Sequence, residues 1–149
     1  MDRITEIFIP KWATNLYALL AIVLVPWIII LASFLPDRHL DRNWDPLWVG
    51  FDIIMLFTIL LTVYFMLSRK IWVIISASAL GTLFIVDAWF DVLTARPGRE
   101  QNQSMAMAVI EIVLSILTFR LVYLIIHQST ERNKIVFTRS KKNKPTLVK

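Results

Sequence analysis

The chain contains 149 residues, of which 57% are hydrophobic and only 18% are charged, and its mean hydropathy is +0.64. These values exclude an ordinary water-soluble enzyme and are typical of a polytopic membrane protein. The chain has no cysteine, which excludes disulfides, thiolate catalysis and cysteine-ligated metal clusters. Its two histidines are too few for a multi-histidine centre, so we expect neither a metal nor a cofactor.

Four stretches of the sequence are long and apolar enough to cross a bilayer, whose core of about 30 Å needs roughly 20 residues in a helix. They span residues 13–35, 47–67, 71–94 and 105–126. The short connection at Ser68-Arg69-Lys70 requires an antiparallel hairpin, and Asn102 and Ser104 are candidate N-caps for the fourth span. The sequence therefore predicts an all-α fold, an antiparallel bundle of four transmembrane helices.

The two ends of the chain differ from this membrane domain, which covers residues 13–126. Residues 1–12 have an amphipathic pattern and are predicted to form an interfacial segment, and residues 127–149 form a basic tail. Eleven Lys and Arg residues fall at the two termini and in the turn between the second and third spans, against four in the other two loops. The positive-inside rule then predicts that both termini are cytoplasmic.

Four acidic residues fall inside the predicted spans, where a charged side chain is energetically costly and often functional. They are Asp52, Asp87, Asp91 and Glu111. At a rise of 1.5 Å per residue they lie roughly 5–10 Å below the outer ends of three different helices. We therefore expect Asp52, Asp87 and Glu111 to approach one another in the outer half of the bundle.

Two interpretations of these carboxyl groups compete, and the first is favoured. In the first they tie helices together, accepting hydrogen bonds from Trp44, Trp48, Trp89 or Ser and Thr side chains, or pairing with Arg96 and Arg99. In the second, several carboxylates at one depth bind a cation or exchange a proton. A role in binding a partner or a polar lipid also stays open.

Small and polar residues mark the packing faces of the third and fourth spans. Ala77 and Gly81 form a small-xxx-small pattern that allows another helix to approach closely. In the fourth span, polar and small side chains recur at three- and four-residue spacing and form one stripe, namely Ala108, Glu111, Ser115 and Thr118. The acidic side chains continue these faces, so they should point into the bundle.

Basic residues at the inner side are expected to contact anionic lipid headgroups. Arg120 lies close enough to the inner boundary for its side chain to reach the phosphates, and the tail supplies further cations, among them Lys141, Lys142 and Lys144. A nucleic-acid partner is not expected, because no aromatic stacking platform accompanies this charge. A membrane-protein partner or a homo-oligomer stays open.

Two segments, WDPLWVGFD and VDAWFDV, are the most distinctive in the chain and span residues 44–52 and 86–92. With the four-span layout, they resemble a group of small uncharacterised bacterial four-transmembrane-helix proteins. The resemblance implies a multi-pass protein of the bacterial plasma membrane. It implies no particular activity. The function expected is a non-enzymatic membrane component or accessory subunit, the alternative being a small proton or cation transporter or channel that uses the four acidic residues.

Overall fold

The computed structural model describes residues 7, 9–34 and 44–142, with the side chains of residues 7, 9–33 and 47–131. This part of the chain is all-helical. It consists of α1 (Lys11–Phe34), α2 (Trp44–Leu67), α3 (Val73–Thr94) and α4 (Arg99–Lys142). The predicted fold class is thus confirmed, whereas the structure contains no membrane that would orient the termini.

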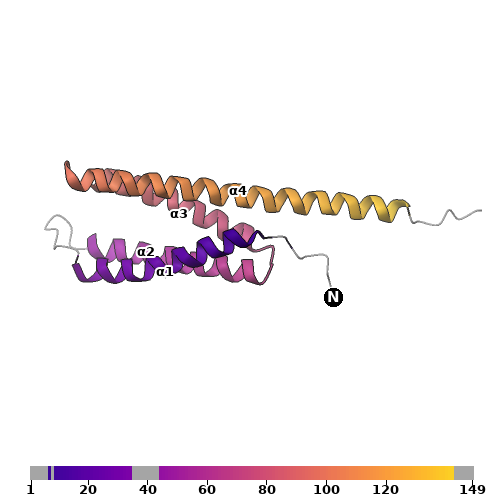
Figure 1. Ribbon diagram of the computed structural model, residues 1–149, viewed down its shortest axis with the longest axis horizontal. Helices are drawn as coiled ribbons and strands as arrows, with labels where there is room; N and C mark the ends of the chain where they lie inside the picture. The colour runs from indigo at the N-terminus through magenta and orange to yellow at the C-terminus, as the bar shows by residue number, and fades with distance from the viewer. Residues whose placement is uncertain (1–6, 8, 35–43, 143–149) are drawn as a thin grey trace, which may run out of the picture.

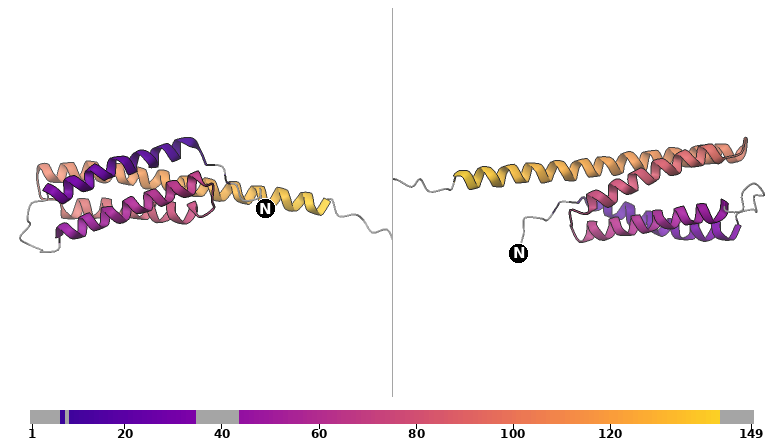
Figure 2. Two further views of the ribbon diagram at one scale, coloured as in Figure 1. Left: turned by 90° about the horizontal axis from the view of Figure 1, so that it is seen from below. Right: turned by 180° about the vertical axis from the view of Figure 1, so that it is seen from behind.

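The four helices run alternately up and down as two hairpins packed on each other (Figure 1). Helix α1 packs on α2, α2 on α3, and α3 on α4. The turn between α3 and α4 lies at the same end of the bundle as the end of α1 and the start of α2, and the α2–α3 turn lies at the opposite end (Figure 2). This arrangement brings segments of all four helices together at one end of the molecule, which we call the pocket end.

The side chains are distributed as in a membrane protein, with many large apolar groups on the outer surface and small and polar groups among the buried ones. Ile22, Leu67 and Val109 are 64–70% exposed, although their transfer out of water is strongly favourable. The buried positions include many alanines and the hydroxyl side chains of Thr62, Ser76, Ser115 and Thr118. Each of the four helices contains a stretch long and apolar enough to cross a membrane, and we conclude that the chain is a multi-pass integral membrane protein.

The predicted packing face of α3 is the seam between α3 and α4. Ala77 and Gly81 are both buried there. The Ser115 hydroxyl donates a 2.8 Å hydrogen bond to the backbone oxygen of Gly81, a contact that requires the two helices to approach closely. The seam thus follows the small-residue pattern in the sequence.

A second buried hydrogen bond joins α1 to α4. The oxygens of Tyr17 and Thr118 lie 2.6 Å apart, and the Thr118 hydroxyl donates to the backbone oxygen of Leu114, also at 2.6 Å. Because Thr118 has a single hydroxyl hydrogen, Tyr17 must be the donor to Thr118. This bond lies about two turns of α4 below Glu111, and it connects the first helix to the last.

Both short turns contain a residue with positive φ. Helix α2 ends in a Schellman motif, in which the amide of Lys70 donates to the backbone oxygen of Phe65 and that of Arg69 to Met66. The left-handed position is occupied by Arg69, with φ 50°, where glycine is the usual residue. In the α3–α4 turn the residue with positive φ is Gly98, at φ 112°, directly before α4.

Helix α4 begins earlier than predicted, and this corrects the assignment of its caps. It starts at Arg99, directly after Gly98, and the amide of Asn102 already donates to the backbone oxygen of Gly98. Asn102 and Ser104 are therefore inside the helix, and their prediction as N-caps is wrong. The physical reason is that the positive φ of Gly98 reverses the chain immediately, so no further loop residues are needed.

The ends of the chain also differ in detail from the predicted segments. Residues 7, 9 and 10 are not helical, and Ile7 is buried in the hydrophobic core. Residues 1–6 and 8 of the predicted interfacial segment lie outside the described residues. Helix α4 has 44 residues, about 66 Å at 1.5 Å per residue, and it extends beyond the other helices (Figure 1), so the beginning of the basic tail is helical.

Candidate functional site

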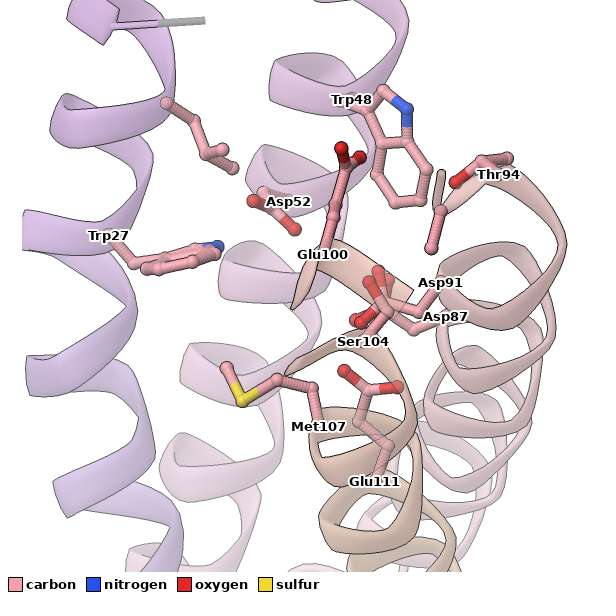
Figure 3. Close-up of a pocket in the computed structure, with 12 residues that line it drawn as sticks. Trp27, Trp48, Asp52, Asp87, Asp91, Thr94, Glu100, Ser104, Met107 and Glu111 are labelled. Carbon is pink, nitrogen blue, oxygen red and sulfur yellow. The ribbon is translucent and has the colours of Figure 1, made fainter. Parts of the chain in front are cut away.

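A pocket of about 270 Å³ lies between the two helix hairpins at the pocket end. We call it the hairpin pocket. Every helix contributes to its wall, which consists of Trp27, Leu31, Trp48, Asp52, Asp87, Asp91, Thr94, Ala95, Glu100, Ser104, Met107 and Glu111. Figure 3 shows the carboxyl groups of Asp87, Asp91 and Glu111 in the space below Trp48, that of Glu100 beside the Trp48 ring, and Asp52 between the two tryptophans in this view.

Helical periodicity explains why these residues share one pocket. Trp27 and Leu31 in α1, Trp48 and Asp52 in α2, and Asp87 and Asp91 in α3 are pairs with four-residue spacing, which places both members of a pair on one helix face. In α4, the lining residues Glu100, Ser104, Met107 and Glu111 follow the same periodicity over three turns. The pocket is thus formed where four inward-facing stripes meet.

Asp52 is the most deeply buried acidic residue of the pocket. Its side chain is 4% exposed, and its Oδ2 atom is buried without a hydrogen-bond partner. Oε2 of Glu111, on the facing helix α4, is also buried and unpartnered. A buried acceptor without a donor costs about 1–3 kcal/mol, so these two oxygens favour any ligand that supplies a donor or a positive charge.

Asp87 and Glu111 are close enough for their carboxyl groups to hydrogen-bond to each other. An ionised carboxylate is only an acceptor, so a hydrogen bond between two carboxyl groups needs a proton on one of them. The pair connects α3 to α4 below the mouth of the pocket. Its geometry is suited to holding a proton between the two side chains.

The structure thus brings all four acidic residues predicted from the sequence into the lining of one pocket. Asp52 comes from α2, Asp87 and Asp91 from α3, and Glu111 from α4. None of them faces outward in the manner of the apolar lipid-facing residues, since each is buried or half-buried. The expectation that the acidic side chains point into the bundle agrees with this placement.

The donors expected to tie these carboxyl groups to the helices are largely elsewhere. Trp89 is 66% exposed, and neither it nor Arg96 or Arg99 is among the residues that line the pocket. The side chain of Trp44 lies outside the described residues. Of the expected donors, Trp48 lines the pocket together with the hydroxyl side chains of Thr94 and Ser104. The Trp48 ring also contacts Phe90 edge-on, at 6.2 Å between ring centroids.

Two further lining residues, Glu100 and Trp27, were not predicted as site residues. Glu100 adds a fifth carboxyl group to the wall. It lies eleven residues before Glu111, nearly three full turns, and this spacing could have identified it if the fourth helix had been extended back to residue 99. Trp27 follows Pro26 in α1, and the only charged residue of that helix, Lys11 at its first position, does not mark which face is directed inward near Trp27.

The arrangement of carboxyl groups is not that of a metal centre. In the part of the chain that the structure describes, no three His, Cys, Asp or Glu side chains are grouped closely enough to hold a metal ion. The acidic side chains are instead spread around a space large enough for a small molecule. The chemistry that the pocket offers is therefore hydrogen-bond acceptance and negative charge beside two indole rings.

The residues predicted to contact lipid headgroups lie away from the pocket. Arg120 is on α4 and exposed. Lys141 and Lys142 are the last two residues of α4, and their side chains lie outside the described residues, as does the whole of Lys144.

Comparisons of the chain with protein-family models, with curated proteins and with solved structures found no match.

Proposed function

We propose that this protein is a non-enzymatic membrane component that binds a cation, in the simplest case a proton, at the hairpin pocket and transports it across the membrane. One observation supports this most strongly, namely the buried and unpartnered oxygens of Asp52 and Glu111 in a wall with five carboxyl groups. Burying negative charge without a partner is costly. A proton or another cation removes this cost, and a pocket at the end of the bundle gives it a path from the medium.

The Asp87–Glu111 pair supports a proton as the first cation to consider. Its carboxyl–carboxyl contact needs one proton, and removal of that proton would place two negative charges side by side. The nearby carboxyl groups of Asp52 and Asp91 line the same pocket and could receive the proton. Exchange between the pair and the medium needs no large movement of the helices.

The competing function, an accessory subunit whose acidic groups only tie helices together, has less support from the geometry. The bundle is joined by other polar contacts, from Ser115 to the Gly81 backbone and from Tyr17 to Thr118. Asp87 and Glu111 do connect two helices, but Asp52 Oδ2 and Glu111 Oε2 have no hydrogen-bond partner among the described residues, so the pocket keeps acceptors that a helix-tying role does not use. We therefore place cation binding ahead of the structural role that the sequence favoured.

The proposal is non-enzymatic because the pocket offers no activated nucleophile. Its hydroxyl groups are those of Thr94 and Ser104, and no histidine or lysine is among the described residues that line it. A hydroxyl nucleophile needs an adjacent base that is oriented by a third group. A wall with five carboxyl groups and no activated nucleophile is better suited to binding a cation than to covalent catalysis.

The location and partners belong to the same proposal. Both termini are placed in the cytoplasm on the distribution of Lys and Arg, which would direct the hairpin pocket outward. The bacterial plasma membrane is proposed on the resemblance of two segments and the four-helix layout. Anionic lipids are the proposed partners of Arg120 and the basic tail. A second membrane protein or a second copy of the chain is a further proposed partner.

Purified protein in liposomes, with a pH-sensitive dye inside, tests the proposed function. We expect wild-type protein to dissipate an imposed pH gradient faster than empty liposomes. Asp87→Asn should abolish this flux, because the amide keeps the shape and hydrogen bonding of the side chain but cannot ionise. The matched control is Glu131→Gln, an exposed position on the extension of α4, which should leave the flux unchanged. A wild-type rate equal to that of empty liposomes would contradict the proposal.

A further inference from the structure

We propose that the hairpin pocket takes an organic ammonium ion, a protonated amine with at least one N–H, held between the carboxyl groups and the indole rings of Trp27 and Trp48. This inference rests on the proposed function, since it names the class of cation that the pocket binds. It follows from the size, the charge, the aromatic residues and the unpartnered acceptors of the pocket.

The size of the pocket points to an organic ligand. Its volume of about 270 Å³ is close to the lower limit of small-molecule pockets, about 300 Å³, and far larger than a proton or a bare metal ion needs. The carboxyl groups are also too dispersed for a metal ion, since the described residues contain no metal-binding group of three. A molecule with several carbon atoms fills the space better than an inorganic cation.

The charge of the wall selects for cations. Five carboxyl groups line the pocket, and no lysine or arginine is among the described lining residues. Walls of low dielectric constant on either side concentrate the field of such a group of charges. An anion or a zwitterion would meet repulsion that a cation does not.

The aromatic residues point to a cation of low hydration, such as an ammonium ion with a hydrocarbon group. Trp27 comes from α1 and Trp48 from α2, and Leu31 and Met107 add apolar wall. In Figure 3 the two indole rings lie on either side of Asp52, and the nitrogen of Trp27 is at the end of its ring nearer Asp52. Tryptophan is the best of the aromatic side chains at attracting ammonium groups, and its surface also covers the carbon part of an amine.

The unpartnered acceptors indicate that the ammonium group has an N–H. Asp52 is 4% exposed, and its buried Oδ2 makes no hydrogen bond to any described residue, nor does Oε2 of Glu111. A primary or secondary ammonium ion donates charge-assisted hydrogen bonds to such oxygens. A quaternary ammonium ion carries the same charge but cannot donate.

Calorimetric titration of the wild-type protein in lipid nanodiscs tests this inference with three probes that share a benzyl group. They are benzylammonium, benzyltrimethylammonium and the neutral benzyl alcohol. We expect benzylammonium to bind at least several-fold more tightly than benzyltrimethylammonium, and benzyl alcohol not to bind measurably. Equal binding of the neutral probe, or tighter binding of the quaternary one, would overturn the assignment.

Three variants locate the binding. Trp27→Leu and Asp52→Asn should each weaken benzylammonium binding about tenfold, whereas Trp89→Leu, at a 66% exposed tryptophan that does not line the pocket, should leave it unchanged. Thermal unfolding of each variant verifies that it is folded, and Trp48→Leu replaces any variant that is not. Binding that is indifferent to the pocket variants would overturn the inference. If benzylammonium does not bind although the pH-gradient assay succeeds, only this inference fails, and if both fail, the proposed function fails with it.

Discussion

Replacing Gly81 with leucine should destabilise the bundle, because the backbones of α3 and α4 approach closely at this position. A Cβ atom on Gly81 would lie 3.0, 3.1 and 3.3 Å from Cε2, Cζ and Cδ2 of the Phe119 ring. The optimal separation of carbon atoms is about 3.5–4.0 Å, so all three contacts are too short. Overpacking of this kind costs about 1–3 kcal/mol, while removing a glycine from a helix regains about 1 kcal/mol.

The size of the new side chain decides which effect prevails. Alanine adds only the Cβ atom, and Phe119 is 39% exposed, so its ring can move outward by a few tenths of an ångström. We therefore expect Gly81→Ala to be within about 1 kcal/mol of wild type. Leucine adds three further carbons in the seam, and we expect Gly81→Leu to lower the free energy of unfolding by about 2 kcal/mol.

The measurement is unfolding in mixed micelles, followed by circular dichroism. Gly50→Leu in α2 is the matched control, because a Cβ atom there has no neighbour within 4 Å, and it should be neutral or slightly stabilising. Phe119→Ala should restore much of the stability lost in Gly81→Leu, giving a coupling of about 1 kcal/mol or more in a double-mutant cycle. Equal stability of the two leucine variants, or the absence of coupling, would refute the reasoning.

Three other predictions test the turn, the orientation and the contact between α1 and α4. Arg69→Gly should be more stable than Arg69→Ala by about 1 kcal/mol in the same unfolding assay, because Arg69 has φ 50° and only glycine adopts it without strain; equal stability would argue against strain. A cysteine at Asn102 should react with an impermeant thiol reagent outside intact cells and one at Asn143 should not, and the reverse pattern would overturn the orientation. Tyr17→Phe should cost about 0.6 kcal/mol of stability, the average for hydrogen bonds in membrane proteins, by removing the donor to Thr118; no change would indicate that water replaces the bond.

Periodicity and the cost of buried charge were sufficient to predict the helices and the direction in which the acidic side chains point. A stretch of about 20 apolar residues in a bilayer must form a helix that spans it, so the number of helices follows from the number of such stretches in the sequence. The Ala77–Gly81 pattern likewise predicted a close helix contact, because only small side chains permit it. These properties depend on local sequence and on the solvent, and both are known without a structure.

The start of α4 and the composition of the pocket wall were not predictable in the same way. Hydropathy places the start of the fourth span near residue 105, because Arg99, Glu100 and the residues that follow are polar, yet the helix begins at Arg99. The contribution of Trp27 depends on how α1 rotates against α2, and that rotation is fixed by packing between distant residues. The sequence analysis also expected Trp89 to donate hydrogen bonds to the acidic residues. Its exposure depends on the same packing and could not be predicted.

Infrared difference spectroscopy of the protein in lipid nanodiscs tests most directly whether the buried carboxyl groups of the hairpin pocket exchange protons with the medium. The account predicts that raising the pH removes a carbonyl band of protonated carboxyl groups in wild-type protein. The band should be reduced in both Asp87→Asn and Glu111→Gln, because the shared proton needs both residues, and unchanged in the control Glu131→Gln. A wild-type spectrum in which no carboxylic-acid band responds to pH, or a band that persists in both pocket variants, would contradict the account.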